Sequence, residues 1–343
     1  MILLQSYSSP SVMSADSGVY NVIKQRFPNL RVLFEKNENI GEVRITKILK
    51  LALQANLLSK TGEMIFGWGG DLAVYAWAIG KMFFTKRLYY SQNLIFRESS
   101  NLGIKGKIRY WLYRKALRSK NFAVTVNSEP LIEYYSEFFA CSKSKFTVVY
   151  DNMSLNDDEK NMQKHVSPEP YVFCGGKAGR DVQTFMEIVK YLPNVHFRCV
   201  FKEGMILPEM KNLKNLKTYT DIPKKDFYEI LNNAAVCCIP LKSKVPCGLY
   251  VMQHAVLLNI PIVSTDTYSM RTIVPNDKYG FLLPMGDAHR MAEKIDLLLN
   301  NKSLCREIAQ NAMKNFDKFK PENVGKQLCD AIYKYQESFS KTI

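Results

Sequence analysis

Short apolar runs alternate with segments of helical periodicity along most of this chain. In the first half, the apolar runs occupy residues 2–6, 30–34, 64–68, 88–91, 122–126 and 146–150. In the second half, they occupy residues 171–174, 195–201, 217–220, 236–240 and 260–264. These runs are apolar throughout instead of alternating with polar residues, which is typical of strands in a parallel sheet covered on both faces.

The segments between these runs have the spacing of amphipathic helices. The pattern predicts one helix that begins at Asp71 and others at residues 19–27, 43–59, 107–120, 129–139, 182–191, 225–232, 249–258, 287–300, 302–316 and 322–335. A repeated order of strand and helix indicates an α/β fold built from doubly wound, Rossmann-like parallel sheets.

A polar stretch without apolar periodicity interrupts the alternation. Residues 151–170 read DNMSLNDDEKNMQKHVSPEP and contain two prolines, which is typical of a linker. We therefore expect an N-terminal domain at residues 1–155 and a second domain at residues 156–320. The last segment, residues 321–343, is expected to pack back toward the first domain as a helix. Two such domains would face each other across a cleft.

Composition adds a strong charge to this picture. The 343 residues are 47% hydrophobic and 23% charged, and the formal net charge is +15. Such a field concentrates anionic partners, which include nucleic acid, anionic lipid and phosphorylated small molecules. Eight cysteines occur without a C-x-x-C pair, which favours a reduced cytosolic protein over a disulfide framework or a zinc site.

Two apolar stretches could be mistaken for targeting or membrane segments. The first residues open a strand and lack the pattern of a signal peptide. Residues 64–84 are apolar apart from Asp71 and Lys81, but Gly67, Gly69 and Gly70 divide them into pieces too short to cross a bilayer. We therefore expect no spanning helix there.

Two loops carry glycine and cations where a ligand is expected. The first, Cys174-Gly175-Gly176-Lys177-Ala-Gly-Arg180-Asp, follows the first strand of the second domain. In the second, Lys242 and Gly248 bound the segment KSKVPCG between the fourth strand and its helix. In a sheet of order 3-2-1-4-5-6 these two loops flank the switch point where ligands bind. Free amides, a helix N-terminus and cations there favour an anion.

Each loop also has a plainer interpretation. Gly175 and Gly176 could form only a tight turn between strand and helix, and Lys242 could lie on an ordinary solvated loop. Neither the dinucleotide motif G-x-G-x-x-G nor the Walker A motif G-x-x-x-x-G-K-[ST] is present. The convergence of both loops on one edge is the reason to favour a binding site.

With these residues in view, the second domain resembles the donor-binding half of GT-B-fold glycosyltransferases. It is most similar to glycosyltransferase family 4 and its relatives in bacterial exopolysaccharide, capsule and lipopolysaccharide synthesis. The resemblance lies in GGKAGRD, in CGLYVMQHAVLLNIPIVSTD, and in residues 270–280 followed by FLLPMGD. It covers about half of the chain, and the first domain matches only in plan.

The resemblance implies roles for particular residues. Arg180 and Lys177 would neutralise the donor diphosphate, and Gly248, Leu249 and Tyr250 would bring a helix N-terminus to it. His254 stands where the family places the second glutamate of an E-x7-E pair, which binds the donor ribose. The first glutamate would fall near Pro246, where no acid is present, so a retaining mechanism is not implied. A structural role for His254 stays an equal alternative.

The family fold also implies chemistry without a metal or another cofactor, because cations and helix dipoles stabilise the leaving group. The sequence has no D-x-D motif and its four histidines are far apart. An inverting enzyme needs a general base from the first domain. Asp71 after Trp68-Gly-Gly is the first candidate, although it could simply cap a helix, and Asp16 and Glu98 are weaker candidates.

One basic segment suggests a surface partner. Between Lys81 and Lys120 there are eleven Lys or Arg and one acid, Glu98. The segment from Lys107 to Lys120, KIRYWLYRKALRSK, would form a helix that could lie on an anionic membrane surface. The alternative is a solvated basic face with the aromatic residues in the core. We expect a cytoplasmic protein, with peripheral contact to the inner leaflet if the first alternative holds.

Together these patterns predict a metal-independent hexosyltransferase. It would move a sugar from a UDP- or GDP-sugar to a glycan or lipid-linked acceptor in bacterial surface polysaccharide synthesis. One alternative is a sugar-nucleotide epimerase of the same fold. Another is a nucleic-acid-binding protein, which the net charge permits but no known nucleic-acid module supports.

Overall fold

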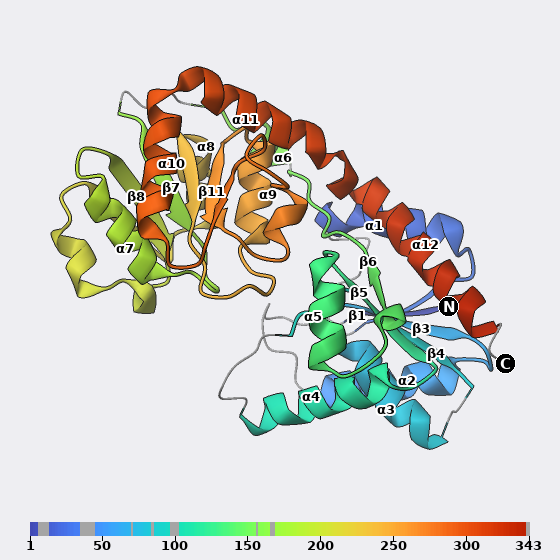
Figure 1. The fold of residues 1–343 in the computed structure, drawn as a ribbon. Helices are drawn as coiled ribbons and strands as arrows, with labels where there is room; N and C mark the ends of the chain where they lie inside the picture. Colours follow the sequence, from blue (N-terminus) through green and yellow to red (C-terminus); the bar gives the residue numbers. More distant parts are fainter. Residues whose placement is uncertain are drawn as a thin grey trace. The chain divides into compact units, whose positions relative to one another are not determined.

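The chain divides into two compact units in the computed structural model. The structure describes residues 1–5, 14–34, 45–69, 71–83, 86–96, 103–155, 157–164 and 169–340, and for residues 14–17 and 157 only the backbone. The first unit comprises Met1–Asn152 and Phe319–Ile343, and the second comprises Met153–Lys318 (Figure 1). Each unit contains one parallel sheet with helices on its faces. The predicted α/β class with two Rossmann-like sheets is therefore confirmed.

The sheet of the first unit has the order β2-β1-β3-β4-β5-β6, and all its strand pairs are parallel. Its strands are β1 (Ile2–Gln5), β2 (Arg31–Phe34), β3 (Met64–Trp68), β4 (Leu88–Ser91), β5 (Phe122–Val126) and β6 (Phe146–Val148). The helices of this unit are α1 (Ser14–Arg26), α2 (Ile45–Leu58), α3 (Leu72–Phe83), α4 (Ile104–Leu117), α5 (Pro130–Phe138) and α12 (Pro321–Ser340). The strands β1, β3, β4 and β5 are buried at every position, as expected for apolar strands covered on both faces.

The last helix closes the first unit. Helix α12 packs along α1 (Figure 1), where the rings of Phe27 and Tyr333 stack with centroids 4.9 Å apart. Gly325 lies at this contact, and a Cβ there would come within 2.8 Å of the Cβ of Val22. A glycine is therefore needed for the two helices to approach this closely.

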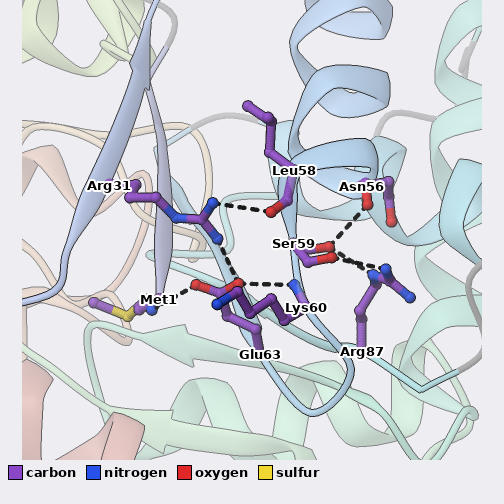
Figure 2. A network of polar contacts seen from close by, with 8 residues as sticks. All are labelled: Met1, Arg31, Asn56, Leu58, Ser59, Lys60, Glu63 and Arg87. Atoms are coloured by element: carbon purple, nitrogen blue, oxygen red, sulfur yellow. Dashed lines mark hydrogen bonds and ion pairs between the residues drawn. The ribbon is translucent and has the colours of Figure 1, made fainter.

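A polar network ties the amino-terminal ends of three strands together (Figure 2). The carboxylate of Glu63 accepts hydrogen bonds from the amino group of Met1 at 3.0 Å, from Arg31 at 2.5 Å and from the backbone N–H of Lys60 at 2.9 Å. Burial would raise the pKa of Glu63, but the bonds from Lys60, Arg31 and the amino terminus outweigh it and lower the pKa to about 2. This network lies at the edge of the sheet opposite to the expected ligand edge.

The second unit has the strand order that the sequence predicts. Its sheet runs β12-β11-β10-β7-β8-β9. When the strands of this unit are numbered along the chain and read from β9, this is the order 3-2-1-4-5-6. The strands are β7 (Tyr171–Gly175), β8 (His196–Phe201), β9 (Leu216–Thr220), β10 (Val236–Ile239), β11 (Ile262–Thr265) and β12 (Phe281–Leu283). The helices are α6 (Asp157–Lys160), α7 (Val182–Tyr191), α8 (Lys224–Asn232), α9 (Leu249–Leu257), α10 (Ala288–Asn300) and α11 (Lys302–Lys314).

Several elements differ from the expectation. Strand β12 has only three residues, and the four-residue helix α6 lies inside the predicted linker. The sequence pattern indicated neither, because three or four residues are too few to show a period. Helix α4 begins and ends three residues earlier than predicted, and α12 continues to Ser340. Four cysteines lie in strands of the second unit and are fully buried, in agreement with reduced core residues: Cys174, Cys199, Cys237 and Cys238.

Candidate functional site: a cationic pocket in the second unit

Two loops of the second unit meet at the carboxyl-terminal edge of its sheet. The backbone N–H of Asp181 donates to the carbonyl of Pro240 at 3.0 Å, and the N–H of Lys242 donates to the carbonyl of Gly179 at 3.0 Å. These bonds join the turn after β7 to the loop after β10. The predicted convergence of the two loops at the switch point is therefore observed.

A pocket of 430 Å³ opens at this junction. Its lining includes five of the residues singled out from the sequence: Gly176, Lys177, Arg180, Gly248 and Tyr250. It also includes Ala178 and Ile222, together with four residues that sequence reasoning did not assign to the site: Lys224, Phe227, Tyr228 and Val251. Among all the described residues that line the pocket, three are cationic, Lys177, Arg180 and Lys224, and none is acidic. Such a lining favours a ligand with both negative charge and flat apolar surface.

Arg180 is fixed between the two loops. Its side chain is 4% exposed, and its Nε donates to the carbonyl of Gly175 at 2.7 Å. A second bond runs from its Nη1 to the carbonyl of Ala178 at 3.3 Å. Burial lowers the pKa of this guanidinium from its ordinary value, and an anion in the pocket would offset that burial.

Two glycines make room for the guanidinium. Gly176 has a φ of +125°, and a Cβ there would come within 2.4 Å of Nη2 of Arg180. Gly248 has a φ of +79° and caps α9, and its Cβ would come within 3.0 Å of Nη1. Glycine is thus required at both positions by backbone conformation and by space. The first turn of α9 consequently reaches the pocket with its positive dipole end.

The other residues predicted for the donor lie around the pocket without lining it. Gly175 ends β7, where a Cβ would come within 2.5 Å of the ring of Phe173, so a glycine there serves packing. The side chain of Lys242 is exposed on its loop, and Leu249 is half-buried in the first turn of α9.

His254 lies behind the pocket wall. It is 1% exposed, and its ring stacks on Tyr228 with centroids 4.3 Å apart and contacts Tyr250 at 4.4 Å. Its Nδ1 faces the carbonyl oxygen of Tyr250 at 2.9 Å. Burial lowers the pKa of the imidazole, which opposes a charged form. Both neighbouring tyrosines line the pocket, so this geometry supports the structural alternative and leaves a direct donor contact as a prediction.

The predicted catalytic carboxylates belong to the first unit. Asp71 precedes α3, and its carboxylate accepts bonds from Nε of Arg109 at 2.8 and 2.9 Å and from the hydroxyl of Tyr113 at 3.0 Å. Asp16 lies in α1, where its side chain is not among those described, and Glu98 lies outside the described residues. The role of each stays a prediction.

Comparison with known proteins adds a family to this geometry. Residues 208–315, which extend from the segment before β9 to the end of α11, match the model of the family described as glycosyl transferases group 1. A stretch of 81 residues is 27% identical to EpsD of Bacillus subtilis (strain 168), a protein named as a glycosyltransferase. That stretch is 24% of this chain and 21% of EpsD, so the match spans about a fifth of the curated relative.

Solved structures match over much more of the chain. Anabaena HepE in complex with UDP-glucose is 15% identical, with a TM-score of 0.70 over 97% of this chain and 99% of HepE. A mutant of TarM from S. aureus, solved with UDP and α-GlcNAc-glycerol, is 20% identical, with a TM-score of 0.59 over 82% of this chain and 58% of TarM. At these identities the likeness establishes the fold. The resemblance of this chain to GT-B-fold glycosyltransferases is confirmed, and residues 208–315 of its second unit match the group 1 glycosyl transferase model.

Proposed function

We propose that this protein transfers a sugar from a nucleoside-diphosphate sugar, UDP- or GDP-linked, to a glycan or lipid-linked acceptor in bacterial surface polysaccharide synthesis. The observation that carries the proposal is the pocket of the second unit, with Lys177, Arg180 and Lys224 beside aromatic side chains. HepE was solved with UDP-glucose and TarM with UDP and a GlcNAc-glycerol, which supports a nucleotide-sugar donor and a glycan-type acceptor.

The pocket residues divide the work of binding the donor. Arg180 and Lys177 bind the diphosphate, and the first turn of α9 adds amide donors and the helix dipole. Phe227 and Tyr250 offer ring faces for the base or the sugar. As the bond to the sugar breaks, the diphosphate gains negative charge, and these cations stabilise it without a metal ion.

The acceptor hydroxyl must lose a proton during the transfer. Asp71 is the first candidate for the base, with Glu98 and Asp16 behind it. A base at Asp71 would have to release one of its bonds to Arg109 or Tyr113 before it could accept that proton.

The first test is binding and turnover with defined nucleotide sugars. A panel of UDP-, GDP- and other nucleotide sugars is titrated while the melting temperature is followed, and the expected result is an upward shift with one nucleotide class. Release of free nucleotide with a glycosylated acceptor supports the transferase. Epimer formation with hydrolysis in the absence of an acceptor supports the epimerase of the same fold. No shift with any nucleotide, together with steeply salt-dependent binding to unrelated nucleic acids, would overturn the proposal.

We also propose that the first unit docks on an anionic membrane surface. Helices α2, α3 and α4 lie side by side on one side of that unit (Figure 1). In α4 the aromatic residues divide, because Tyr113 is buried in the core while Trp111 is 56% exposed. The outward apolar residues of the three helices are Ile45, Leu49, Leu53, Leu57, Leu58, Met82, Phe83, Ile104, Ile108 and Trp111.

Charge selects a bilayer over a second copy of this chain. The three helices carry eight Lys or Arg, two on α2, one on α3 and five on α4, and no Asp or Glu. Two copies would bring like charges together, whereas anionic headgroups attract each nearby cation by about 1 kcal/mol. In the described residues, no helix is long and apolar enough to span a bilayer. The docking would therefore be peripheral, on the cytoplasmic leaflet where a lipid-linked sugar diphosphate could be reached.

Flotation with lipid vesicles tests the docking. Vesicles with anionic phospholipid should bind the protein at least about ten-fold more tightly than neutral vesicles, and Trp111→Ala should weaken that binding several-fold. Tyr191→Ala is the matched control, because Tyr191 is 54% exposed on α7 of the second unit. Equal binding to both vesicle types, or a lipid-free dimer that Trp111→Ala dissociates, would contradict membrane docking.

A further inference from the structure

A buried carboxylate lies behind the pocket of the second unit and is not explained by the donor contacts. Glu159 on α6 is 6% exposed. Its Oε1 lies 3.2 Å from Nζ of Lys224, and its Oε2 lies 3.6 Å from Nε2 of His254. A carboxylate removed from water is costly unless it is paired, and Lys224 supplies a positive charge beside it.

Lys224 stands where the helix itself disfavours a cation. It is the first residue of α8, and Lys225 follows it, so two ammonium groups lie near the positive end of the helix dipole. The ammonium of Lys224 also lies over the ring of Tyr228, 5.3 Å from its centroid. Burial acts to lower the pKa of Lys224, but Tyr250 and Glu159 outweigh it and the pKa is raised. Asp226 in the same turn offsets one of these charges, and Lys224 is the lysine of the pair that lines the pocket.

His254 completes the cluster from the other side. Its Nδ1 faces a backbone carbonyl, which can only accept, so Nδ1 carries the proton of the neutral ring. Its Nε2 is then unprotonated, with its lone pair toward Glu159, and no described residue donates a hydrogen bond to it. Of these two neighbours of the carboxylate, Lys224 is the closer one, and it is the one that carries a positive charge. Glu159 thus restrains Lys224, while His254 supports the rings of Tyr228 and Tyr250.

We propose that Glu159 is a positioning residue that holds the ammonium of Lys224 at the pocket, where it binds the negative charge of a nucleoside diphosphate. This inference rests on the proposed function and extends it, because it gives Lys224 the negative charge of the donor to bind and gives Glu159 a role in placing that lysine. Glu159 itself does not line the pocket, so its effect on the ligand passes through Lys224.

The experiment is a double-mutant cycle on the full chain, read by calorimetric titration with UDP and with uridine. Lys224→Met should weaken UDP binding about 5- to 10-fold, in the range expected for one partly exposed charge pair. Glu159→Gln should weaken it about 3- to 5-fold. In the Lys224→Met background, Glu159→Gln should change UDP affinity less than about two-fold, because its effect requires the lysine. Uridine, which lacks phosphate, should be insensitive to all of these changes.

A matched lysine and a spectroscopic signal separate positioning from general damage. Lys225→Met removes the same charge one residue along the helix from a side chain that does not line the pocket, and should leave UDP binding unchanged. The charge of Glu159 raises the pKa of His254, so Glu159→Gln should lower that pKa further in an NMR titration. Additive losses in the cycle, or equal losses for UDP and uridine, would overturn the positioning role alone. A wild-type chain that binds no nucleoside diphosphate would instead overturn the proposed function, and the inference with it.

Discussion

The carboxyl-terminal edges of the two sheets share a parallel architecture but carry different chemistry. In the second unit, Arg180 and the glycines around it leave a pocket with cations on its walls. In the first unit, three of the described residues that follow strands bond to one another. Asp151 after β6 accepts hydrogen bonds from the side-chain amides of Asn93 after β4 and Asn127 after β5, the latter at 2.7 Å.

The difference shows how loop residues decide what a sheet edge does. Glycine and cations leave room and charge for an external anion, whereas two amide N–H groups at the first edge are taken up by the carboxylate of Asp151. Substitutions of Asp151 and its two amide partners are therefore expected to change the stability of the fold, whereas substitutions around Arg180 are expected to change ligand binding.

The largest effect is expected at Arg180. Arg180→Ala removes a buried guanidinium from between the two loops and should weaken binding of the donor nucleotide at least about 100-fold, measured by calorimetric titration. Lys242→Ala is the control, because that side chain is exposed outside the pocket, and less than about a two-fold change is expected. A loss at Lys242 as large as that at Arg180 would move the site onto the loop after β10.

Asp151 tests the first edge through pH. Burial raises the pKa of Asp151 to about 6, although the bond from Asn127 partly opposes this. Because folding raises this pKa, the protonated carboxyl of Asp151 adds to the free energy of unfolding. That contribution is complete below the ordinary pKa of 3.8 and is lost as pH rises through 6. Asp151→Asn abolishes this titration, so the variant should gain about 2 kcal/mol relative to wild type between pH 4 and pH 7, measured by denaturant unfolding. A difference in unfolding free energy between variant and wild type that stays constant across that range would show that Asp151 does not titrate as stated. A change in nucleotide affinity in the variant would contradict a purely structural role for Asp151.

Gly248 separates backbone strain from ligand geometry. Gly248→Ala should destabilise the fold by about 1–2 kcal/mol, because alanine is disfavoured at its φ of +79°, and should weaken nucleotide binding several-fold by displacing Arg180. Gly62→Ala is the matched control, since Gly62 has a φ of +78° and its Cβ would meet nothing within 4 Å. Thermal unfolding and nucleotide titration of both variants provide the comparison. Equal effects of the two substitutions on affinity would rule out the contact with Arg180 as the cause.

Much of the fold could be predicted because buried parallel strands leave a strong local pattern. The strands Met64–Trp68, Leu88–Ser91 and Phe122–Val126 and the helix Val182–Tyr191 have the predicted bounds. The strand order of the second sheet followed from the right-handed repetition of strand and helix. The meeting of the two glycine-containing loops was then a consequence of topology, and it did not depend on any side-chain detail.

The parts of the site that could not be predicted depend on long-range pairing. Glu159 and Lys224 are far apart in the sequence, and Glu159 lies in a polar stretch that reads as a linker. Periodicity also could not decide which side of α4 faces the core, because apolar residues occur all around that helix. The structure resolves this by burying Tyr113 and exposing Trp111. The occupied carboxylate of Asp71 was hidden for the same reason, since Arg109 pairs with it across the fold.

The position of α12 on α1 has a consequence for the order of folding during synthesis. The second unit is one continuous piece of chain, so it has all its strands once Lys318 has left the ribosome. The first unit combines Met1–Asn152 with the later segment Phe319–Ile343. Helix α1 is therefore synthesised long before Pro321–Ser340, the helix that covers its apolar side. The half that is translated first is therefore the half that matures last, and a chain stopped short of Pro321 would present that uncovered side to chaperones and proteases.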